Sequence, residues 1–230
     1  MDYNHLFHVH TLRCCHAGNE PDEEYVKKAV FLKADSIFFT DHAPFPNDIF
    51  GNRMKMAELE EYYDSLCLLQ KEYKGILTIN IGLEIEYIPE FSDYYKWLIG
   101  KYGFALFLGQ HICKYNGKYN FEYSDKREEY KWMTDSIIEA CNQDIFSVLL
   151  HPERIYRNCD KWDNEQIESA DCLWNIPIPI EYNYSSRKTL PECSKHFWSR
   201  KSHNNIVYGL DAHNTKDLED GVACFRKIAL

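Results

Sequence analysis

The sequence lacks several features that would assign it at once to a class of protein. None of its apolar runs approaches the ~18 residues of a membrane-spanning helix, and MDYNHLFHVH does not resemble a basic and then apolar export signal. It also has no internal repeat, no low-complexity segment and no Pro/Gly/Ser-rich hinge. We therefore expect a cytoplasmic protein with no membrane partner, folded as a single domain over residues 1–230.

Positive charge and paired cysteines are lacking as well. The chain has 26 Lys and Arg against 36 Asp and Glu, a formal net charge of -10, so its average field repels nucleic acid and anionic membranes. No nucleic-acid partner is expected. The nine cysteines are odd in number and scattered, with no C-x-x-C pair. This pattern indicates reduced thiols and argues against both a disulfide framework and a cysteine-based zinc site.

What the sequence does contain is an alternation of short apolar runs with longer helical stretches. Seven runs are candidate strands: LFHVHT, DSIFFTDH, ILTINIGLEIEY, FALFLGQH, FSVLLHPE, NIPIPIEYNY and NIVYGLDAH. Helical spacing occurs at 21–34, 56–73, 126–143, 188–203 and 216–229. Such alternation predicts an α/β fold with a parallel sheet or barrel. The Pro/Gly/Asn-rich stretch 42–54 is predicted to be a lid or substrate loop, and the aromatic-rich stretch 114–132 a loop entering a helix.

Polar side chains gather where these runs end. They are His8, His10, Asp41, His42, Glu84, His111, His151, Asn183, Asp211 and His213. In a parallel barrel the carboxyl ends of the strands meet at one mouth, where active sites are built. Imidazole and carboxylate groups together suit zinc, iron or manganese. The sequence therefore predicts a metal site at this rim.

Strand alternation refines the prediction without completing it. His8 and His10 share parity and should project side by side, whereas His5 has the opposite parity. His5, His196 and His203 are expected at the surface. Glu84 and Glu86 lie on one face of the same run, so the two-residue period of a strand does not decide which of them is the ligand.

The ordered motifs carry a family resemblance. They are His8-Val-His10, Thr40-Asp41-His42, Gly82-Leu83-Glu84, Gln110-His111, His151-Pro152 and Gly209-Leu210-Asp211-Ala212-His213. In this order, over nearly the whole chain, they resemble the polymerase-and-histidinol-phosphatase (PHP) superfamily. Arg53-Met54 and KEYKGILTINIGLEIEY are similar to its histidinol-phosphatase branch. The resemblance implies a distorted seven-stranded (β/α)7 barrel.

The resemblance also implies a centre of three divalent ions, which would be zinc, iron or manganese. By motif position, the first ion would be held by His8, His10, Glu84 and Asp211, the second by Glu84, His111 and His151, and the third by His16, His42 and His213. Glu84 is then the preferred bridge, with Glu86 behind it. The vicinal Cys14 and Cys15 would be bystanders.

The activity implied is hydrolysis of a phosphate monoester by a metal-bridging hydroxide, with histidinol phosphate, from histidine biosynthesis, as the leading small phosphorylated metabolite. Candidates for protonating the leaving group or orienting ligands are Asp41, Asp211 and His213, and the sequence does not choose among them. Arg157 and Arg187 are the nearest matches to the family's phosphate-binding arginines, and Arg154 is a rival for the first role. Two alternatives stay open, a phosphodiesterase or exonuclease acting on nucleotides and a noncatalytic metal-binding module.

Overall fold

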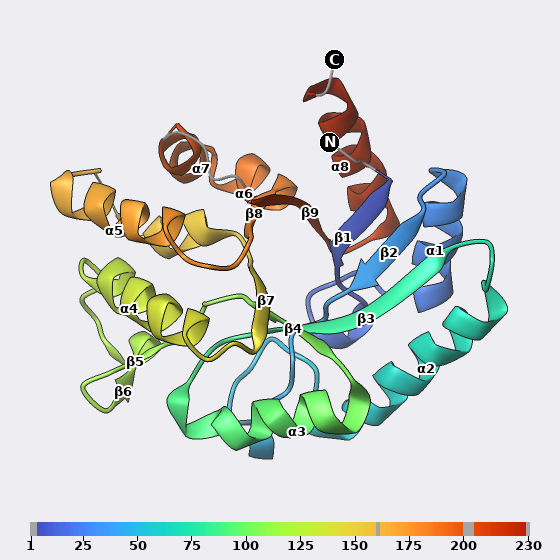
Figure 1. The fold of residues 1–230 in the computed structure, drawn as a ribbon, viewed down its shortest axis with the longest axis horizontal. Coiled ribbons are helices and arrows are strands. Elements are labelled where there is room, and N and C mark those ends of the chain that lie inside the picture. The colour runs from blue at the N-terminus through green and yellow to red at the C-terminus, as the bar shows by residue number, and fades with distance from the viewer. Residues whose placement is uncertain (1–3, 160–161, 200–204, 229–230) are drawn as a thin grey trace. The chain divides into compact units, whose positions relative to one another are not determined.

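The computed structural model describes residues 4–159, 162–199 and 205–228 of the chain (Figure 1). Each of the seven apolar runs overlaps a strand: β1 (His5–Val9), β2 (Ser36–Phe39), β3 (Thr78–Ile85), β4 (Ala105–Leu108), β7 (Phe146–Leu149), β8 (Ile180–Asn183) and β9 (Ile206–Ala212). Their order, β1-β2-β3-β4-β7-β8-β9, is the topology of a closed barrel. The predicted α/β fold class with seven barrel strands is confirmed.

The chain divides into two compact units. The first unit runs up to Glu84 and resumes at Tyr208, and the second unit comprises Ile85–Val207. Both divisions fall inside strands, β3 and β9, rather than in loops. A division of this kind leaves no Pro/Gly-rich linker in the sequence, which explains why composition gave no sign of it. The single domain over 1–230 stays a prediction.

The first unit is built on four parallel strands in the order β9-β1-β2-β3. The register shifts between Leu6 and Val9 of β1, and β9 shifts at the same level. His8 (φ 70°) and Asp211 (φ 51°) have left-handed backbone conformations there. Such residues cost about 1–3 kcal/mol each and gather at functional sites. The distortion expected of this barrel is therefore located at two of its predicted metal ligands.

Three helices cover this part of the sheet: α1 (Asp22–Phe31), α2 (Leu59–Glu72) and α8 (Thr215–Ile228). Helix α1 begins after Pro21 with three acidic residues, which favour a helix start because they face the positive end of its dipole. It packs against β2, α2 and α8 (Figure 1). Helix α8 begins where Asn214 Oδ1 accepts the Asp217 amide at 2.9 Å. These helices were expected from their spacing.

The second unit holds the parallel strands β4, β7 and β8 and five helices: α3 (Ser92–Tyr102), α4 (Glu129–Cys141), α5 (Asn164–Trp174), α6 (Tyr184–Thr189) and α7 (Pro191–Trp198). Helices α3 and α5 were not predicted. The start of α5 carries a readable signal, because Asp163 and Gln166 form a capping box. The predicted helix over 188–203 is wrong as a single element, since Pro191 begins a new helix there and residues 200–204 lie outside the described residues.

The aromatic-rich stretch also contains an element that was not predicted. Strands β5 (Lys114–Tyr115) and β6 (Lys118–Tyr119) form an antiparallel hairpin before α4. Asn116 and Gly117 connect them with φ of 46° and 78°. An Asn-Gly pair between two strands is a strong hairpin signal, because both residues tolerate positive φ. The stretch is thus a hairpin followed by a helix.

The stretch 42–54, predicted to be a lid or substrate loop, is packed. Phe45, Phe50, Arg53 and Met54 are all buried. The Arg53 guanidinium lies over both aromatic rings, 5.3 Å and 5.6 Å from their centroids. Its Nη1 donates to the Ala43 carbonyl at 3.2 Å and its Nε to the Gly51 carbonyl at 3.3 Å. One arginine therefore ties the loop together from within.

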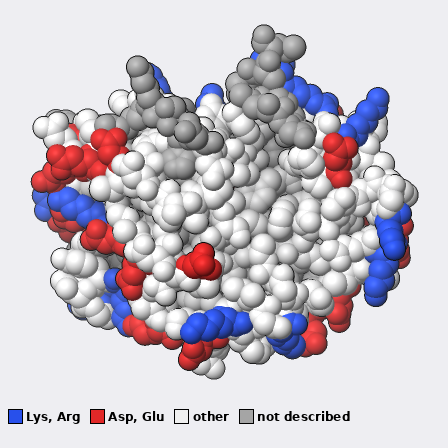
Figure 2. Space-filling view, viewed as in Figure 1, with Lys and Arg blue, Asp and Glu red and all other residues white. Residues whose placement is uncertain are grey.

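Charged side chains of both signs lie mainly along the edges of the face shown in Figure 2. Several form ion pairs, as Lys27 does with Glu24 and Lys131 with Glu165. Exposed pairs of this kind contribute about 0–1 kcal/mol each, so they do little to hold the fold together. In the part of the chain that the structure describes, no helix is long and apolar enough to cross a membrane.

Candidate metal centre

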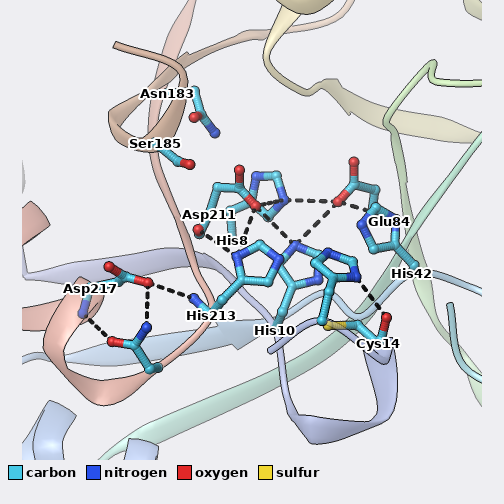
Figure 3. Close-up of polar contacts among 12 residues, drawn as sticks. His8, His10, Cys14, His42, Glu84, Asn183, Ser185, Asp211, His213 and Asp217 are labelled. Atoms are coloured by element: carbon cyan, nitrogen blue, oxygen red, sulfur yellow. Dashed lines mark hydrogen bonds and ion pairs between the residues drawn. The ribbon is translucent and has the colours of Figure 1, made fainter. Parts of the chain in front are cut away.

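Four buried side chains of the first unit converge on one point (Figure 3). They are His8 and His10 from the end of β1, Glu84 from β3 and Asp211 from β9, each at most 3 % exposed. His8 Nε2 lies 3.0 Å from Glu84 Oε2 and 3.6 Å from Asp211 Oδ1. His10 Nε2 lies 3.2 Å from each of the same two oxygens. The four predicted ligands of the first ion are thus brought together.

The charges of this group call for a cation. Two carboxylates are buried side by side, and such charges are stable in a protein interior only when they are compensated. Burial alone would lower the pKa of His10, but the neighbouring Asp211, Cys14 and Glu84 outweigh it and raise the pKa well above its ordinary value. Either a proton or a metal ion can supply the missing positive charge. Metal ions bind neutral imidazole and so displace that proton.

The donor atoms fit a metal ion in spacing and in kind. An ion about 2.0–2.2 Å from tetrahedrally placed nitrogen and oxygen ligands holds those ligands about 3.4 Å apart. The four distances in this group range from 3.0 to 3.6 Å. Both ring nitrogens of His10 are buried and make no hydrogen bond within the described residues. A site built only for hydrogen bonding would not leave them so.

Three further histidines surround His10 in the same unit. His213 stacks on it with ring centroids 4.4 Å apart, and the His42 ring lies 4.9 Å away. His16, in the loop after β1, lies 4.7 Å from His213 and 5.2 Å from His42. The three residues predicted to hold the third ion are therefore neighbours.

Backbone carbonyls fix the tautomers of two of these rings. His16 Nδ1 lies 2.8 Å from the Cys14 carbonyl oxygen, and His213 Nδ1 lies 3.0 Å from that of Asp211. Since a carbonyl oxygen only accepts, each Nδ1 must carry the proton and donate it. The lone pair is then left on Nε2, the usual arrangement of a metal-binding histidine. His213 Nε2 is buried without a hydrogen-bond partner in the described part of the chain.

Asp41 is fully buried beside these rings. Its Oδ1 accepts the Thr11 backbone amide at 2.8 Å, whereas Oδ2 has no hydrogen-bond partner among the described residues. Burial raises the pKa of Asp41 to about 7, although the nearby His10 works in the opposite direction. Asp41 is absent from the groups of donor atoms close enough to share an ion. Its position agrees with the expected role of an orienting or proton-carrying residue.

Cys14 is the residue that the sequence argument passed over. Its sulfur lies in one donor group with His10 and His213, close enough for the three atoms to share an ion. Burial raises the pKa of its thiol, but the nearby imidazoles of His10, His16 and His213 outweigh burial and lower the pKa to about 4. The signal was its position, four residues after one predicted ligand and two before another.

The remaining two predicted ligands lie together in the second unit. His111 follows β4 and His151 follows β7, and their ring centroids are 4.8 Å apart. His151 (φ 28°) is another ligand candidate with positive φ. Its amide donates to Glu181 Oε2 at 2.8 Å, and Asn183 Nδ2 donates to the same oxygen at 3.0 Å. Glu181, which was not predicted, thus connects β8 to the backbone of a predicted ligand.

The three candidate arginines differ in their surroundings. Arg154 and Arg157 line a small cavity of the second unit together with Gln110 and His111. Arg154 is further oriented by Ser186, whose Oγ accepts from its Nε at 2.8 Å. Arg187 is exposed and its guanidinium lies over the Tyr182 ring, 4.6 Å from the centroid. Arg154 and Arg157 therefore stand beside a ligand candidate.

Comparison with known proteins places the chain in a family. A model of the PHP domain matches residues 6–173, well over half of the sequence. The chain belongs to the PHP domain family. A histidinol-phosphatase of Bacillus subtilis is 37 % identical over 102 residues, 42 % of this chain and 38 % of that protein. A relative from Deinococcus radiodurans is 30 % identical over 125 residues, 54 % of this chain and 47 % of that protein. Each match thus spans less than half of the relative's length.

The fold comparison extends over more of the chain. A solved structure of histidinol phosphate phosphatase from Lactococcus lactis has a TM-score of 0.73 at 19 % sequence identity, covering 97 % of this chain and 91 % of that one. At this identity the likeness shows the shared fold. It is the same PHP barrel that the order of the strands indicates.

The PHP match and the structure complement each other at the predicted ligands. Asp211 and His213 lie beyond the residues that the family model matches. The structure brings them to the site because β9 pairs with β1, and the His10 amide donates to the Ala212 carbonyl at 2.9 Å. Glu84 belongs to the donor group of His8, His10 and Asp211, and Glu86 belongs to no such group among the described residues, which favours Glu84 as the PHP ligand.

Proposed function

We propose that this PHP protein is a metal-dependent phosphomonoesterase that hydrolyses a small phosphate ester, with histidinol phosphate as its substrate. The name of the Bacillus subtilis relative supports this substrate. The Lactococcus lactis structure, which has the same fold, was solved with zinc, L-histidinol and phosphate. Both observations concern other proteins. We apply them to this chain because it belongs to the same family and has the candidate metal ligands at its site.

The observation that carries the proposal is the convergence of His8, His10, Glu84 and Asp211. Four side chains of metal-binding type from three strands meet in the interior, with the histidine nitrogens 3.0–3.6 Å from the carboxylate oxygens. Their nearest neighbours are further imidazoles. A fold that only needed to be stable would not bury two carboxylates and several imidazoles side by side, because each costs desolvation energy.

The proposal assigns three divalent ions to nine residues. The first ion takes His8, His10, Glu84 and Asp211, the second takes Glu84, His111 and His151, and the third takes His16, His42 and His213. Divalent ions held in this way lower the pKa of water and stabilise the charge of a phosphoryl group in transit. The pairing of Glu84 with His111 and His151 is proposed from the order of the PHP motifs.

The chain's own residues would bind the phosphate and supply a proton. Arg154 and Arg157 are positioned to hold phosphate oxygens, since a guanidinium fork suits bidentate contact with them. Asp211 and His213 are committed to ions in this assignment, which leaves Asp41 as the proton donor to the leaving oxygen. Oδ1 of Asp41 is fixed by the Thr11 amide, so Oδ2 is the atom that would carry the proton.

Phosphate release from histidinol phosphate tests the proposal, with manganese, zinc and iron(II) supplied separately to the purified protein. We expect metal-dependent turnover that exceeds the turnover of a bis-aryl phosphodiester. His8→Asn should abolish it. His5→Asn is the matched control, because His5 lies on the same strand but is exposed and bonded to Ser36.

Three results would count against the proposal. Faster cleavage of the diester would point to a phosphodiesterase of the same fold. Metal binding without hydrolysis of any ester in a panel of phosphorylated metabolites would indicate a noncatalytic module. Equal activity in His8→Asn and His5→Asn would show that the buried group is not the catalytic centre.

A further inference from the structure

Two adjacent cysteines in the first unit have opposite surroundings. Cys14 ends the short helix Leu12–Cys14 and is completely buried, whereas Cys15 is exposed. Cys15 has φ of 68°, and its thiol faces the carbonyl oxygens of Arg13 and Arg53. The left-handed turn at Cys15 therefore separates the two side chains, and only Cys14 is directed toward the buried histidines (Figure 3).

The Cys14 sulfur lies beside ring nitrogens of two histidines, His10 and His213. Its Sγ and one ring nitrogen each of His10 and His213 all lie within 4.8 Å of one another. His10 is fully buried, and neither of its ring nitrogens makes a hydrogen bond in the described part of the chain. His213 Nε2 is also buried without a hydrogen-bond partner in the described residues, whereas Nδ1 of the same ring donates to the Asp211 carbonyl. Buried polar atoms left in this way indicate a ligand that satisfies them together.

The other buried cysteines of the described chain show that burial alone does not produce this arrangement. Cys113 and Cys141 are buried too. Neither belongs to a group of donor atoms close enough to share an ion. Burial raises the pKa of the Cys141 thiol to about 12, which is the usual behaviour of a cysteine that serves only packing.

We propose that the Cys14 thiolate is a ligand of the divalent ion held by His213, so that this PHP centre binds metal through sulfur as well as nitrogen and oxygen. The inference rests on the metal centre of the proposed function and adds a ligand to it. Binding forms a metal–sulfur bond and releases the thiol proton to solvent, with no change in the oxidation state of sulfur or metal.

A thiolate changes which metals the centre prefers. Sulfur is a soft ligand that favours zinc and other later transition metals, whereas manganese and magnesium prefer oxygen. The ion beside Cys14 should therefore be zinc-like in its selectivity, even if the carboxylate-bound ions accept manganese. The donor atoms therefore predict a centre whose metal sites differ in the metal that they prefer.

Cobalt(II) titration of the metal-free full-length protein tests the ligand directly. Cobalt bound through sulfur shows an intense near-ultraviolet charge-transfer band, and its visible d–d bands report bound cobalt whatever the ligand. We expect the near-ultraviolet band in the wild type and in Cys15→Ser and its loss in Cys14→Ser, with visible bands kept. The preference for zinc over manganese should fall by at least about tenfold, the lower limit for losing an outer-shell partner.

A measurement without any variant covers the case that Cys14→Ser folds poorly. X-ray absorption of the zinc-loaded wild type should require a sulfur scatterer at about 2.3 Å besides nitrogen and oxygen at about 2.0–2.1 Å. A spectrum fitted by nitrogen and oxygen alone would overturn the inference. So would a charge-transfer band that survives in Cys14→Ser, or visible bands in the wild type without that band.

These outcomes separate the inference from the function on which it rests. A chain that hydrolyses histidinol phosphate but shows no sulfur band or scatterer would refute the thiolate ligand alone. A chain that shows both sulfur signals but releases no phosphate would refute the proposed activity and support the ligand. Failure to bind cobalt at all, with no visible bands, would overturn both.

Discussion

The two units contribute different chemistry to the residues singled out by the sequence. In the first unit, seven of the nine predicted ligands lie together, and two of the seven, Glu84 and Asp211, are buried carboxylates. In the second unit, His111 and His151 are neighbours, and the cavity beside His111 is lined by Arg154 and Arg157. The first unit is suited to cations, whereas in this part of the second unit the two arginines outnumber Glu129, the one carboxylate that lines the same cavity.

This difference suggests how a phosphatase site could be divided. Metal binding would depend mainly on strands β9, β1 and β3, and phosphate recognition on the segments after β4 and β7. Substitutions in the first unit should then change metal content and turnover together. Substitutions at the arginines should change substrate binding and leave metal content alone.

Glu84→Gln should have the largest effect. Its carboxylate lies 3.0–3.2 Å from the Nε2 atoms of both His8 and His10, and an amide is a poor ligand and a poor bridge. We expect loss of bound metal and a fall in turnover on the order of 10³-fold, at least as large as removing one transition-state donor. Metal analysis and phosphate release measure the two effects on one sample.

The neighbouring Glu86→Gln is the matched comparison. Glu86 is equally buried on the same run, but it belongs to no donor group within the described residues. It should retain its metal. If Glu86→Gln loses metal and Glu84→Gln keeps it, the assignment of the first unit's ligands is wrong.

The sequence could predict the parts of this site that repeat a local pattern. Apolar runs predicted all seven barrel strands, and the ordered His, Glu and Asp motifs predicted candidate ligands, seven of which lie in the first unit and two in the second. The choice between Glu84 and Glu86 depended on family resemblance, because both share a strand face and only the pairing of strands separates them. The bulges at His8 and Asp211 were beyond prediction from alternation, since they depend on register between distant strands.

Other features were missed for reasons of three kinds. The hairpin at Asn116-Gly117 and the start of α5 carried local signals that went unread. The proximity of Cys14 to His213 could not be predicted without the fold, because these two residues are far apart in the sequence. The packing of the loop 42–54 was hidden by its turn-rich composition, although its aromatic residues were visible.

Arg154→Ala should have the next largest effect, and it should distinguish the contribution of the second unit from that of the first, because it affects substrate binding and not metal binding. Removing a charge-assisted contact to phosphate costs about 1.5–3 kcal/mol, which corresponds to roughly a 10–100-fold rise in KM. Metal content should stay unchanged, because Arg154 is not a ligand. Steady-state kinetics on histidinol phosphate and metal analysis provide the readouts.

Two further arginine variants sharpen this prediction. Arg157→Ala should raise KM as well, since Arg157 lines the same cavity. Arg187→Ala should change KM little, because its guanidinium is exposed over Tyr182. A larger effect at Arg187 than at Arg154 would place phosphate recognition after β8 instead of after β7.

Glu153→Gln should have a smaller effect, seen in stability as a function of pH. Glu153 is fully buried with neither oxygen hydrogen-bonded within the described residues, and burial raises its pKa from 4.5 to about 8. The folded protein therefore keeps a proton that the unfolded chain loses above its ordinary pKa. By linkage, stability falls as pH rises from 4.5 to about 8 and then levels off.

The glutamine variant should remove this pH dependence. Its Tm should exceed that of the wild type at pH 8, by about 2–4 °C for each kcal/mol gained, and the two should converge near the ordinary carboxyl pKa of about 4. Glu168→Gln, on the exposed side of α5, is the control and should shift nothing. A Glu153→Gln variant less stable than the wild type at pH 8 would show that the carboxylate is charged and compensated in the second unit.

Arg53→Met should have the smallest effect and tests whether the loop 42–54 of the first unit is rigid. The change keeps much of the apolar stem against Phe45 and Phe50 but removes the hydrogen bonds to the Ala43 and Gly51 carbonyls. Each such bond contributes about 0.5–1.5 kcal/mol, so we expect a modest loss of stability and faster proteolysis within the loop. Arg127→Met, which removes an exposed ion pair with Asp125, should do neither. Because the loop is packed, the KM of Arg53→Met should change less than the KM of Arg154→Ala. A larger change would indicate that the loop contacts the substrate, and that part of substrate recognition lies in the first unit.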